Sequence, residues 1–150
     1  MAVHVLELHH HGIRVGTTPA ELDQARDFYT RVLGLTPDPG RNIPGQPGYW
    51  MDLGTAQIHL MAVAGTSSLA KSPREDPSLP HVALAVSDIQ EAKKELDRLG
   101  QKYFSIIGVT GPYAEQIFMH DPAGNLIELH QIGTCRCNKT APAGVVARVS

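Results

Sequence analysis

The segment His81–Val86, with the sequence HVALAV, repeats the pattern of an earlier segment, His10–Val15, with the sequence HHGIRV. In both segments a histidine opens a short run with alternating apolar positions, and a valine follows five residues later. Such alternation is typical of a β-strand with one buried face. A repeat of this kind predicts that the chain is built from two similar halves.

A helix is predicted after each of these two strands. The first has Thr18 as its N-cap, Pro19 at the first helical position and Glu21 to complete a capping box, and Gly34 is placed to end it. The second is expected over residues 88–100 and ends at a glycine. Six residues at helical spacing form the apolar stripe of the first helix: Leu22, Ala25, Phe28, Tyr29, Val32 and Leu33.

Three further strands are predicted in each half. They lie near residues 35–37, 48–53 and 56–63, and near 102–108, 115–120 and 125–131. The sequence therefore predicts an α+β fold. Two βαβββ repeats form a curved mixed sheet, a half-barrel, around a metal site, with the helices on the outside. We expect one domain over residues 1–132, with the repeats at about 6–63 and 81–132, a linker at 64–80 and a C-terminal tail at 133–150.

The composition is that of an ordinary globular protein. Of 150 residues, 42% are hydrophobic and 19% charged, and the formal net charge is −2. No basic stripe suits nucleic acid, no apolar run reaches the roughly 20 residues that span a bilayer, and the N-terminal segment does not resemble a secretion signal. The two cysteines, Cys135 and Cys137, are too few for a disulfide framework. We expect a cytoplasmic protein that binds neither nucleic acid nor membrane.

Four metal-capable side chains occupy matching places in the two halves. His10 and His81 open the first strand of each repeat, and His59 and Glu128 lie in the last strand of each. Pairing of the repeats about a pseudo-twofold axis brings all four to one point. Three imidazoles and one carboxylate suit a single divalent ion (Zn, Ni, Fe, Co or Mn), with open positions for two adjacent oxygens of a substrate.

Catalytic side chains are predicted beside Glu128. A type I turn at residues 121–124 sets Phe118 opposite Glu128 and Gln116 opposite His130. Gln116 and His130 then face the same cavity as Glu128, and His130 is the leading candidate for a partner of the ligands or for an acid or base.

Other residues are predicted to face toward or away from the site by the alternation of side chains along a strand or by their position in a loop. Tyr113 could reach the site from a loop, and Gln57 shares the face of His59. His9 and His11 are expected on the face opposite to His10, as packing or surface residues, because strand side chains alternate.

The chain resembles the vicinal oxygen chelate (VOC) superfamily, which includes glyoxalase I, methylmalonyl-CoA epimerase, extradiol dioxygenases and bleomycin-resistance proteins. The resemblance covers about residues 6–132. It implies metal ligands on the first and last strand of each repeat, an enzyme that acts on a small molecule with adjacent oxygens, and a homodimer. Five segments carry it: His9–Val15, Asp27–Leu35, Ile58–Leu60, His81–Leu84 and Asp121–Leu129.

The resemblance leaves three functions open. We favour a metal-dependent isomerase or lyase that stabilises an enolate or oxyanion, although glyoxalase I usually has Glu or Gln where this chain has His59. The first alternative is a non-haem Fe(II) dioxygenase of the extradiol type, which would use His10, His81 and Glu128 as a facial triad. Those enzymes, however, have a tyrosine at the position of Phe118. The second alternative is a metal-free protein that sequesters a ligand.

Overall fold

The computed structural model describes residues 2–41, 43, 45–110 and 113–133. The chain divides into two compact units. The N-terminal unit is His10–His81, and the C-terminal unit combines Met1–His9 with Val82–Ser150. The residues before His10 therefore group with the second repeat. Cys135 and Cys137, and most of the expected C-terminal tail, lie outside the described residues.

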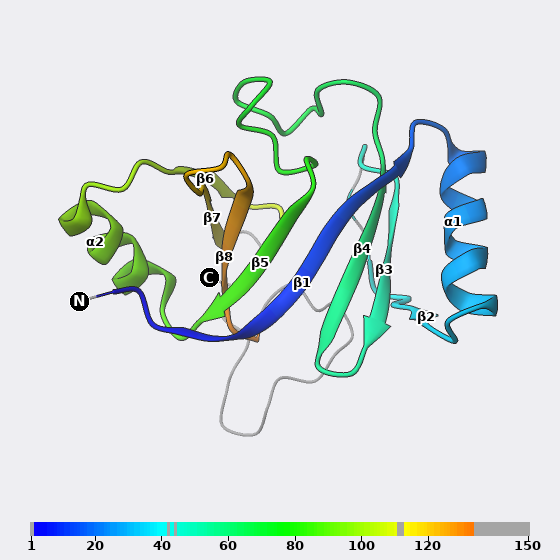
Figure 1. Cartoon of the computed structure of the whole chain (residues 1–150), viewed down its shortest axis with the longest axis horizontal. Helices are drawn as coiled ribbons and strands as arrows, with labels where there is room; N and C mark the ends of the chain where they lie inside the picture. Colours follow the sequence, from blue (N-terminus) through cyan, green and yellow to red (C-terminus); the bar gives the residue numbers. More distant parts are fainter. Residues whose placement is uncertain (1, 42, 44, 111–112, 134–150) are drawn as a thin grey trace. The chain divides into compact units, whose positions relative to one another are not determined.

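The N-terminal unit contains the first repeat as a four-stranded mixed sheet with one helix. Its strand order is β2-β3-β4-β1, in which β1 and β4 are parallel and the other neighbours are antiparallel. The helix α1 lies against β3 and β4 (Figure 1). The elements are β1 (Val5–Gly16, shared with the C-terminal unit), α1 (Pro19–Arg31), β2 (Thr36–Pro37), β3 (Gly48–Leu53) and β4 (Ala56–Ala62).

The C-terminal unit repeats this arrangement in the strand order β5-β8-β7-β6, with α2 against β7 and β8. Its elements are β5 (His81–Val86), α2 (Ile89–Leu99), β6 (Phe104–Ile107), β7 (Glu115–His120) and β8 (Leu126–Gln131). The predicted α+β class and the two βαβββ repeats are confirmed. Among the described residues, no helix is long and apolar enough to cross a membrane.

The ends of both helices follow the predicted signals. The Thr18 hydroxyl accepts the backbone N–H of Glu21 at 3.2 Å, and the Glu21 carboxylate accepts the backbone N–H of Thr17 at 3.1 Å. Both contacts satisfy donors that a helix start leaves unpaired. The sheet covers only part of the predicted apolar stripe. Phe28 in α1 and Val32 and Leu33 just after it are 49%, 59% and 54% exposed.

The turn between β7 and β8 sets the predicted register. The N–H of Asp121 donates to the carbonyl of Asn125 at 2.9 Å, and Gly124 has a φ of +91°, which a glycine adopts without strain. Phe118 consequently pairs with Glu128, as predicted. The prediction that Glu128 and Gln116 share one face of the sheet follows from this register.

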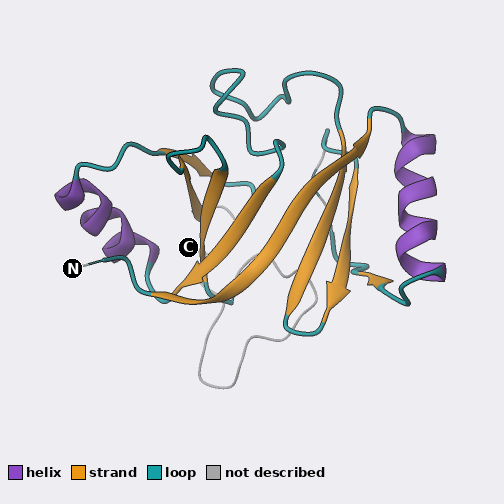
Figure 2. Cartoon of the chain, viewed as in Figure 1, coloured by secondary structure: helices purple, strands orange, loops and turns teal. Residues whose placement is uncertain are grey.

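Alternation along the strands separates a packing face from a polar face in each unit. In the N-terminal unit, Leu60 and Met51 pack under α1. In the C-terminal unit, Leu129 and Ile117 pack under α2. The neighbouring positions in the same strands point the other way, and these carry the histidines and Glu128. The linker from residue 63 to 80, all of which is described, contains no helix or strand of its own (Figure 2).

The cap of α2 yields a stability prediction. The Asp88 carboxylate accepts the N–H groups of Gln90 at 2.9 Å and Glu91 at 3.2 Å. We expect Asp88→Ala to lower the free energy of unfolding by about 1 kcal/mol, because both donors lose this acceptor. Urea denaturation followed by circular dichroism measures the change. Lys94→Ala, an exposed substitution in the same helix, is the control and should leave the midpoint nearly unchanged; equal effects would contradict the capping argument.

Candidate metal centre

Three buried histidines come together in the N-terminal unit. His10, His59 and His81 are 2%, 5% and 5% exposed. The parallel register of β1 and β4 pairs His10 with Gln57, which places the imidazole of His10 on the same face as that of His59. The two rings stack with centroids 3.7 Å apart, and the Nε2 atoms of His10 and His81 are 3.0 Å apart.

The protonation of His81 follows from its neighbour Leu79. The Nδ1 of His81 lies 2.6 Å from the carbonyl oxygen of Leu79. A carbonyl only accepts hydrogen bonds, so Nδ1 carries the hydrogen. Burial lowers the pKa of His81 to about 4, although the Leu79 carbonyl works in the opposite direction. The ring is therefore neutral at pH 7, and its lone pair lies on Nε2, which faces His10.

Gly12 leaves the space that the ring of His81 fills. A Cβ atom at position 12 would lie 2.6 Å from Cε1 and 3.0 Å from Nε2 of that ring. These distances are shorter than side-chain contacts allow, so any other residue at this position displaces His81. The backbone of β1 therefore determines where the imidazole sits.

His59 is held by an amide network. Its Nε2 lies 3.0 Å from Oε1 of Gln57, whose amide nitrogen donates to carboxylates of Asp38 at 3.1 Å and Asp52 at 2.9 Å. These two acceptors orient the amide, so its oxygen accepts a hydrogen from His59. Trp50, the β3 partner of His59, stacks on the same ring at 4.3 Å. Asp38 was not singled out by the sequence, because only the fold brings it to Gln57.

The C-terminal unit contains a second cluster of buried polar side chains, which surrounds Glu128. Glu128 is 1% exposed, and burial raises its pKa to about 8, which a hydrogen bond from Gln116 only partly offsets. The Gln116 amide nitrogen is 3.4 Å from Oε1 of Glu128, and Nε2 of His130 is 3.3 Å from Oε2. The structure thus brings Gln116 and His130 to Glu128, the arrangement expected from the strand register.

Three further predicted positions have different surroundings. His9 is fully buried and its ring is stacked on that of His130, with centroids 4.2 Å apart, so it is a packing residue, whereas His11 is exposed. Tyr113 is 73% exposed and borders a hollow of about 140 Å³ together with Gln90. A catalytic role for Tyr113 stays a prediction.

Comparison with known proteins assigns the family. The family model of the glyoxalase/bleomycin resistance protein/dioxygenase superfamily matches residues 7–129. The chain belongs to this superfamily. Its members among the matched proteins include a glyoxylase, an epimerase and a dioxygenase, which are names of enzymes.

Individual relatives of the superfamily cover nearly the whole chain. Glyoxylase I 4 of Arabidopsis thaliana is 24% identical over 149 residues, 99% of this chain and 80% of the relative. Methylmalonyl-CoA epimerase from Mycobacterium tuberculosis is 27% identical with a TM-score of 0.65, over 87% of this chain and 91% of that chain. A catechol 2,3-dioxygenase, 20% identical with a TM-score of 0.56 over 85% of this chain and 41% of that one, shares the fold.

The contact between Gly12 and His81 can be tested by a double-mutant cycle. We expect Gly12→Ala to cost about 1–3 kcal/mol of stability, because the added methyl overpacks against the imidazole. In a His81→Ala background the same substitution should cost much less, because the ring is gone. Urea denaturation followed by the fluorescence of Trp50, the only tryptophan, provides the measurement. An equal cost in both backgrounds would show that the ring does not limit the space.

The raised pKa of Glu128 predicts a pH dependence of the chelator-treated protein. Between the ordinary glutamate pKa of 4.5 and about 8, the folded state holds a proton that the unfolded state has lost, so stability falls as pH rises. His81 acts in the opposite sense between about 4 and 6.5, so the range from pH 6.5 to 8, in which Glu128 acts, lies above the range of His81. The slope there is at most about 1.4 kcal/mol per pH unit.

Urea denaturation at pH 6.5 and pH 8 in the presence of EDTA measures this slope. Glu128→Gln should abolish it, whereas Glu115→Gln, which removes another buried carboxylate of the same unit, should retain it. A wild-type protein that is equally stable at both pH values would refute the assignment.

Proposed function

We propose that this protein is a metal-dependent enzyme of the isomerase or lyase type. It binds adjacent oxygens of a small substrate to a divalent ion and stabilises an enolate or oxyanion. The observation that carries the proposal is the pair of buried Nε2 atoms of His10 and His81. Imidazole nitrogens bind such ions at about 2.0–2.1 Å, so two Nε2 atoms that lie 3.0 Å apart would both be within reach of one ion.

Glu128 is the proposed carboxylate ligand. It holds the same place in β8 that His59 holds in β4, and both side chains lie on the polar face of their sheets. A buried carboxyl with a raised pKa is poorly stabilised as an anion by its protein neighbours alone. A nearby divalent cation supplies the opposite charge that makes ionisation favourable.

His59 is proposed as a fourth ligand because it holds the same place in the first repeat as Glu128 holds in the second. Its hydrogen bond to Gln57 limits this role. Its Nε2 donates to Gln57 as the ring now lies, so ligation through this atom requires the ring to release Gln57. The Nε2 atoms of His10 and His81 already face each other. We therefore expect His59 to contribute less to metal affinity than the other three.

The chemistry assigned to the protein side chains is proton transfer at carbon. A bound divalent ion supplies a Lewis acid that stabilises negative charge on a substrate oxygen. His130 is the proposed group that takes a proton from the carbon next to that oxygen and returns it, and Gln116 orients Glu128 through its amide. Return of the proton by His130 to a neighbouring carbon on the same face gives an isomerisation, whereas an epimerisation would also need a proton donor on the opposite face of the carbon.

One feature favours a second candidate function. Two histidines and one carboxylate are the ligand set of non-haem Fe(II) oxygenases, and a catechol 2,3-dioxygenase shares the fold. Against it, Phe118 pairs with Glu128, is fully buried, and offers no hydrogen-bond donor to a substrate oxygen. The proton-transfer reaction is therefore preferred. The homodimer and the cytoplasmic location expected from the sequence stay predictions.

Metal binding tests the proposed centre directly. We expect one divalent ion per chain by elemental analysis of protein purified without chelator. His10→Ala, His81→Ala and Glu128→Gln should each weaken Zn²⁺ binding by about 100-fold or more, measured by competition with a chelator of known affinity. His11→Ala is the matched control, an exposed histidine on the same strand, and should bind as the wild type does. Retention of full affinity in all three variants would eliminate the centre.

The reaction type is tested with the metal-loaded protein in D₂O under anaerobic conditions. Methylmalonyl-CoA is a suitable probe, since an epimerase of this fold was solved with it bound. Uptake of deuterium at its acidic carbon, detected by mass spectrometry and lost in His130→Ala, supports proton transfer. Oxygen consumption with catechol by the Fe(II)-loaded protein, without deuterium uptake, would favour the dioxygenase instead.

A further inference from the structure

A tight turn leads the linker into His81. Residues Asp76, Pro77, Ser78 and Leu79 form it, and the N–H of Leu79 donates to the carbonyl of Asp76 at 3.1 Å. Aspartate at the first position and proline at the second are favoured in such turns. Pro80 follows, and a residue that precedes proline is restricted to extended conformations. The backbone torsion angles between this turn and the carbonyl of Leu79 are therefore restricted.

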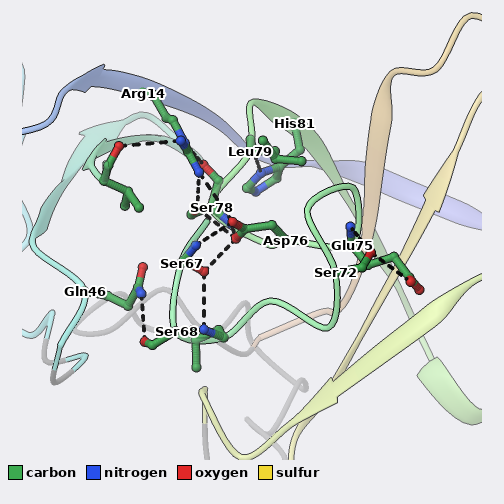
Figure 3. Close-up of polar contacts among 12 residues, drawn as sticks. Arg14, Gln46, Ser67, Ser68, Ser72, Glu75, Asp76, Ser78, Leu79 and His81 are labelled. Atoms are coloured by element: carbon green, nitrogen blue, oxygen red, sulfur yellow. Dashed lines mark hydrogen bonds and ion pairs between the residues drawn. The ribbon is translucent and has the colours of Figure 1, made fainter. Parts of the chain in front are cut away.

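Asp76 is the centre of a buried polar cluster in the linker (Figure 3). Its side chain is fully buried and accepts hydrogen bonds from the N–H and hydroxyl of Ser67 at 2.7 and 2.6 Å and from those of Ser78 at 2.9 and 2.8 Å. Burial alone would raise the pKa of Asp76, but these bonds outweigh it and hold the pKa below its usual value. The cluster thus contains a carboxylate, which accepts hydrogen bonds more strongly than a neutral group.

Arg14 ties this cluster to β1. Its Nε donates to the carbonyl of Ser78 at 3.0 Å, and its Nη2 donates to the Ser78 hydroxyl at 2.7 Å and to the Asp76 carboxylate at 3.4 Å. Arg14 lies two residues after Gly12, on the same face of the strand, and Gly12 contacts the ring of His81. One strand therefore holds both the turn before His81 and the space for its imidazole.

We propose that Arg14, Ser67, Asp76 and Ser78, the linker cluster, position the imidazole of His81 by fixing the carbonyl of Leu79. That carbonyl keeps the hydrogen of His81 on Nδ1 and presents Nε2 toward His10. The inference rests on the proposed function in one respect, namely that Nε2 of His81 binds the metal ion. Outer partners that orient metal-binding histidines in this way change metal affinity by about 10–100-fold. Arg14 and Asp76 are thus positioning residues rather than ligands.

The structure distinguishes this role from ordinary stabilisation of a loop. Hydrogen bonds that only stabilised the fold of the linker would not change the tautomer of His81 or its affinity for a metal ion. Here the path is short and continuous: Asp76 fixes the turn, the turn ends at Leu79, and the Leu79 carbonyl bonds the ring at 2.6 Å. A change at Asp76 should therefore appear at His81 as altered tautomer and altered metal affinity.

The test uses Asp76→Asn in the full chain. Asparagine replaces one acceptor oxygen by a donor and removes the charge opposite Arg14. Long-range ¹H–¹⁵N NMR of the metal-free protein at pH 7 reports the tautomer of His81. We expect a single Nδ1–H tautomer in the wild type and a mixture in Asp76→Asn, together with an increase of about 10–100-fold in the dissociation constant for Zn²⁺. Glu115→Gln, which breaks the buried contact with Lys93 in the other unit, is the control and should change neither quantity.

The outcomes separate the two proposals. If the wild type binds no Zn²⁺ but Asp76→Asn still changes the tautomer, the positioning role holds and the proposed metal function fails. If the wild type binds Zn²⁺ and Asp76→Asn changes neither tautomer nor affinity, the positioning role is refuted. Should Asp76→Asn not fold, Ser78→Ala removes only the hydroxyl between Arg14 and Asp76. It is expected to shift both readouts in the same direction by a smaller amount, and no shift in this folded variant would overturn the inference.

Discussion

Strand alternation constrains everything else in this protein, because each four-stranded sheet has only two faces. One face packs under a helix, with Leu60 and Met51 in the N-terminal unit and Leu129 and Ile117 in the C-terminal unit. Neighbouring residues must then point to the other face, whatever their chemistry. His59 and Glu128 are next to Leu60 and Leu129, so the apolar packing that stabilises each sheet also determines where the metal-capable side chains lie. Loss of register by one residue would exchange the two sets.

Burial of so many polar groups has to be offset by hydrogen bonds or charge. In the N-terminal unit this is largely achieved within the protein: Leu79 bonds His81, and Gln57 links His59 to two carboxylates. Glu128 differs, because its neighbours Gln116 and His130 leave its pKa well above the usual range. The N-terminal unit thus holds neutral nitrogen donors in fixed positions. The C-terminal unit holds a carboxyl group whose anionic form needs a positive partner.

The sequence was sufficient to predict the features that depend on a local pattern of residues. Repetition around His10 and His81 identified the two halves, the capping residues located both helices, and the turn at Asp121 established that Phe118 pairs with Glu128. Features that depend on tertiary approach could not be predicted. Gly12 contacts His81 from 69 positions away along the chain, and Asp38 reaches Gln57 from 19. The exposure of Phe28 could not be predicted for a similar reason, since periodicity shows that a helix has an apolar stripe but not how much of it the sheet covers.

The hydrogen positions in the histidine pair determine how a cation would exchange with protons. With its hydrogen on Nδ1, His81 has a lone pair on Nε2, and two facing lone pairs 3.0 Å apart would repel. His10 must therefore carry its hydrogen on Nε2 while no cation is bound. His10 and His81 would hold a cation through their Nε2 atoms, and His10 would then carry its hydrogen on Nδ1. Glu128, with a pKa of about 8, is protonated at pH 7 and has to release its proton in order to bind a cation. Glu128 should accordingly make metal affinity rise with pH up to about 8.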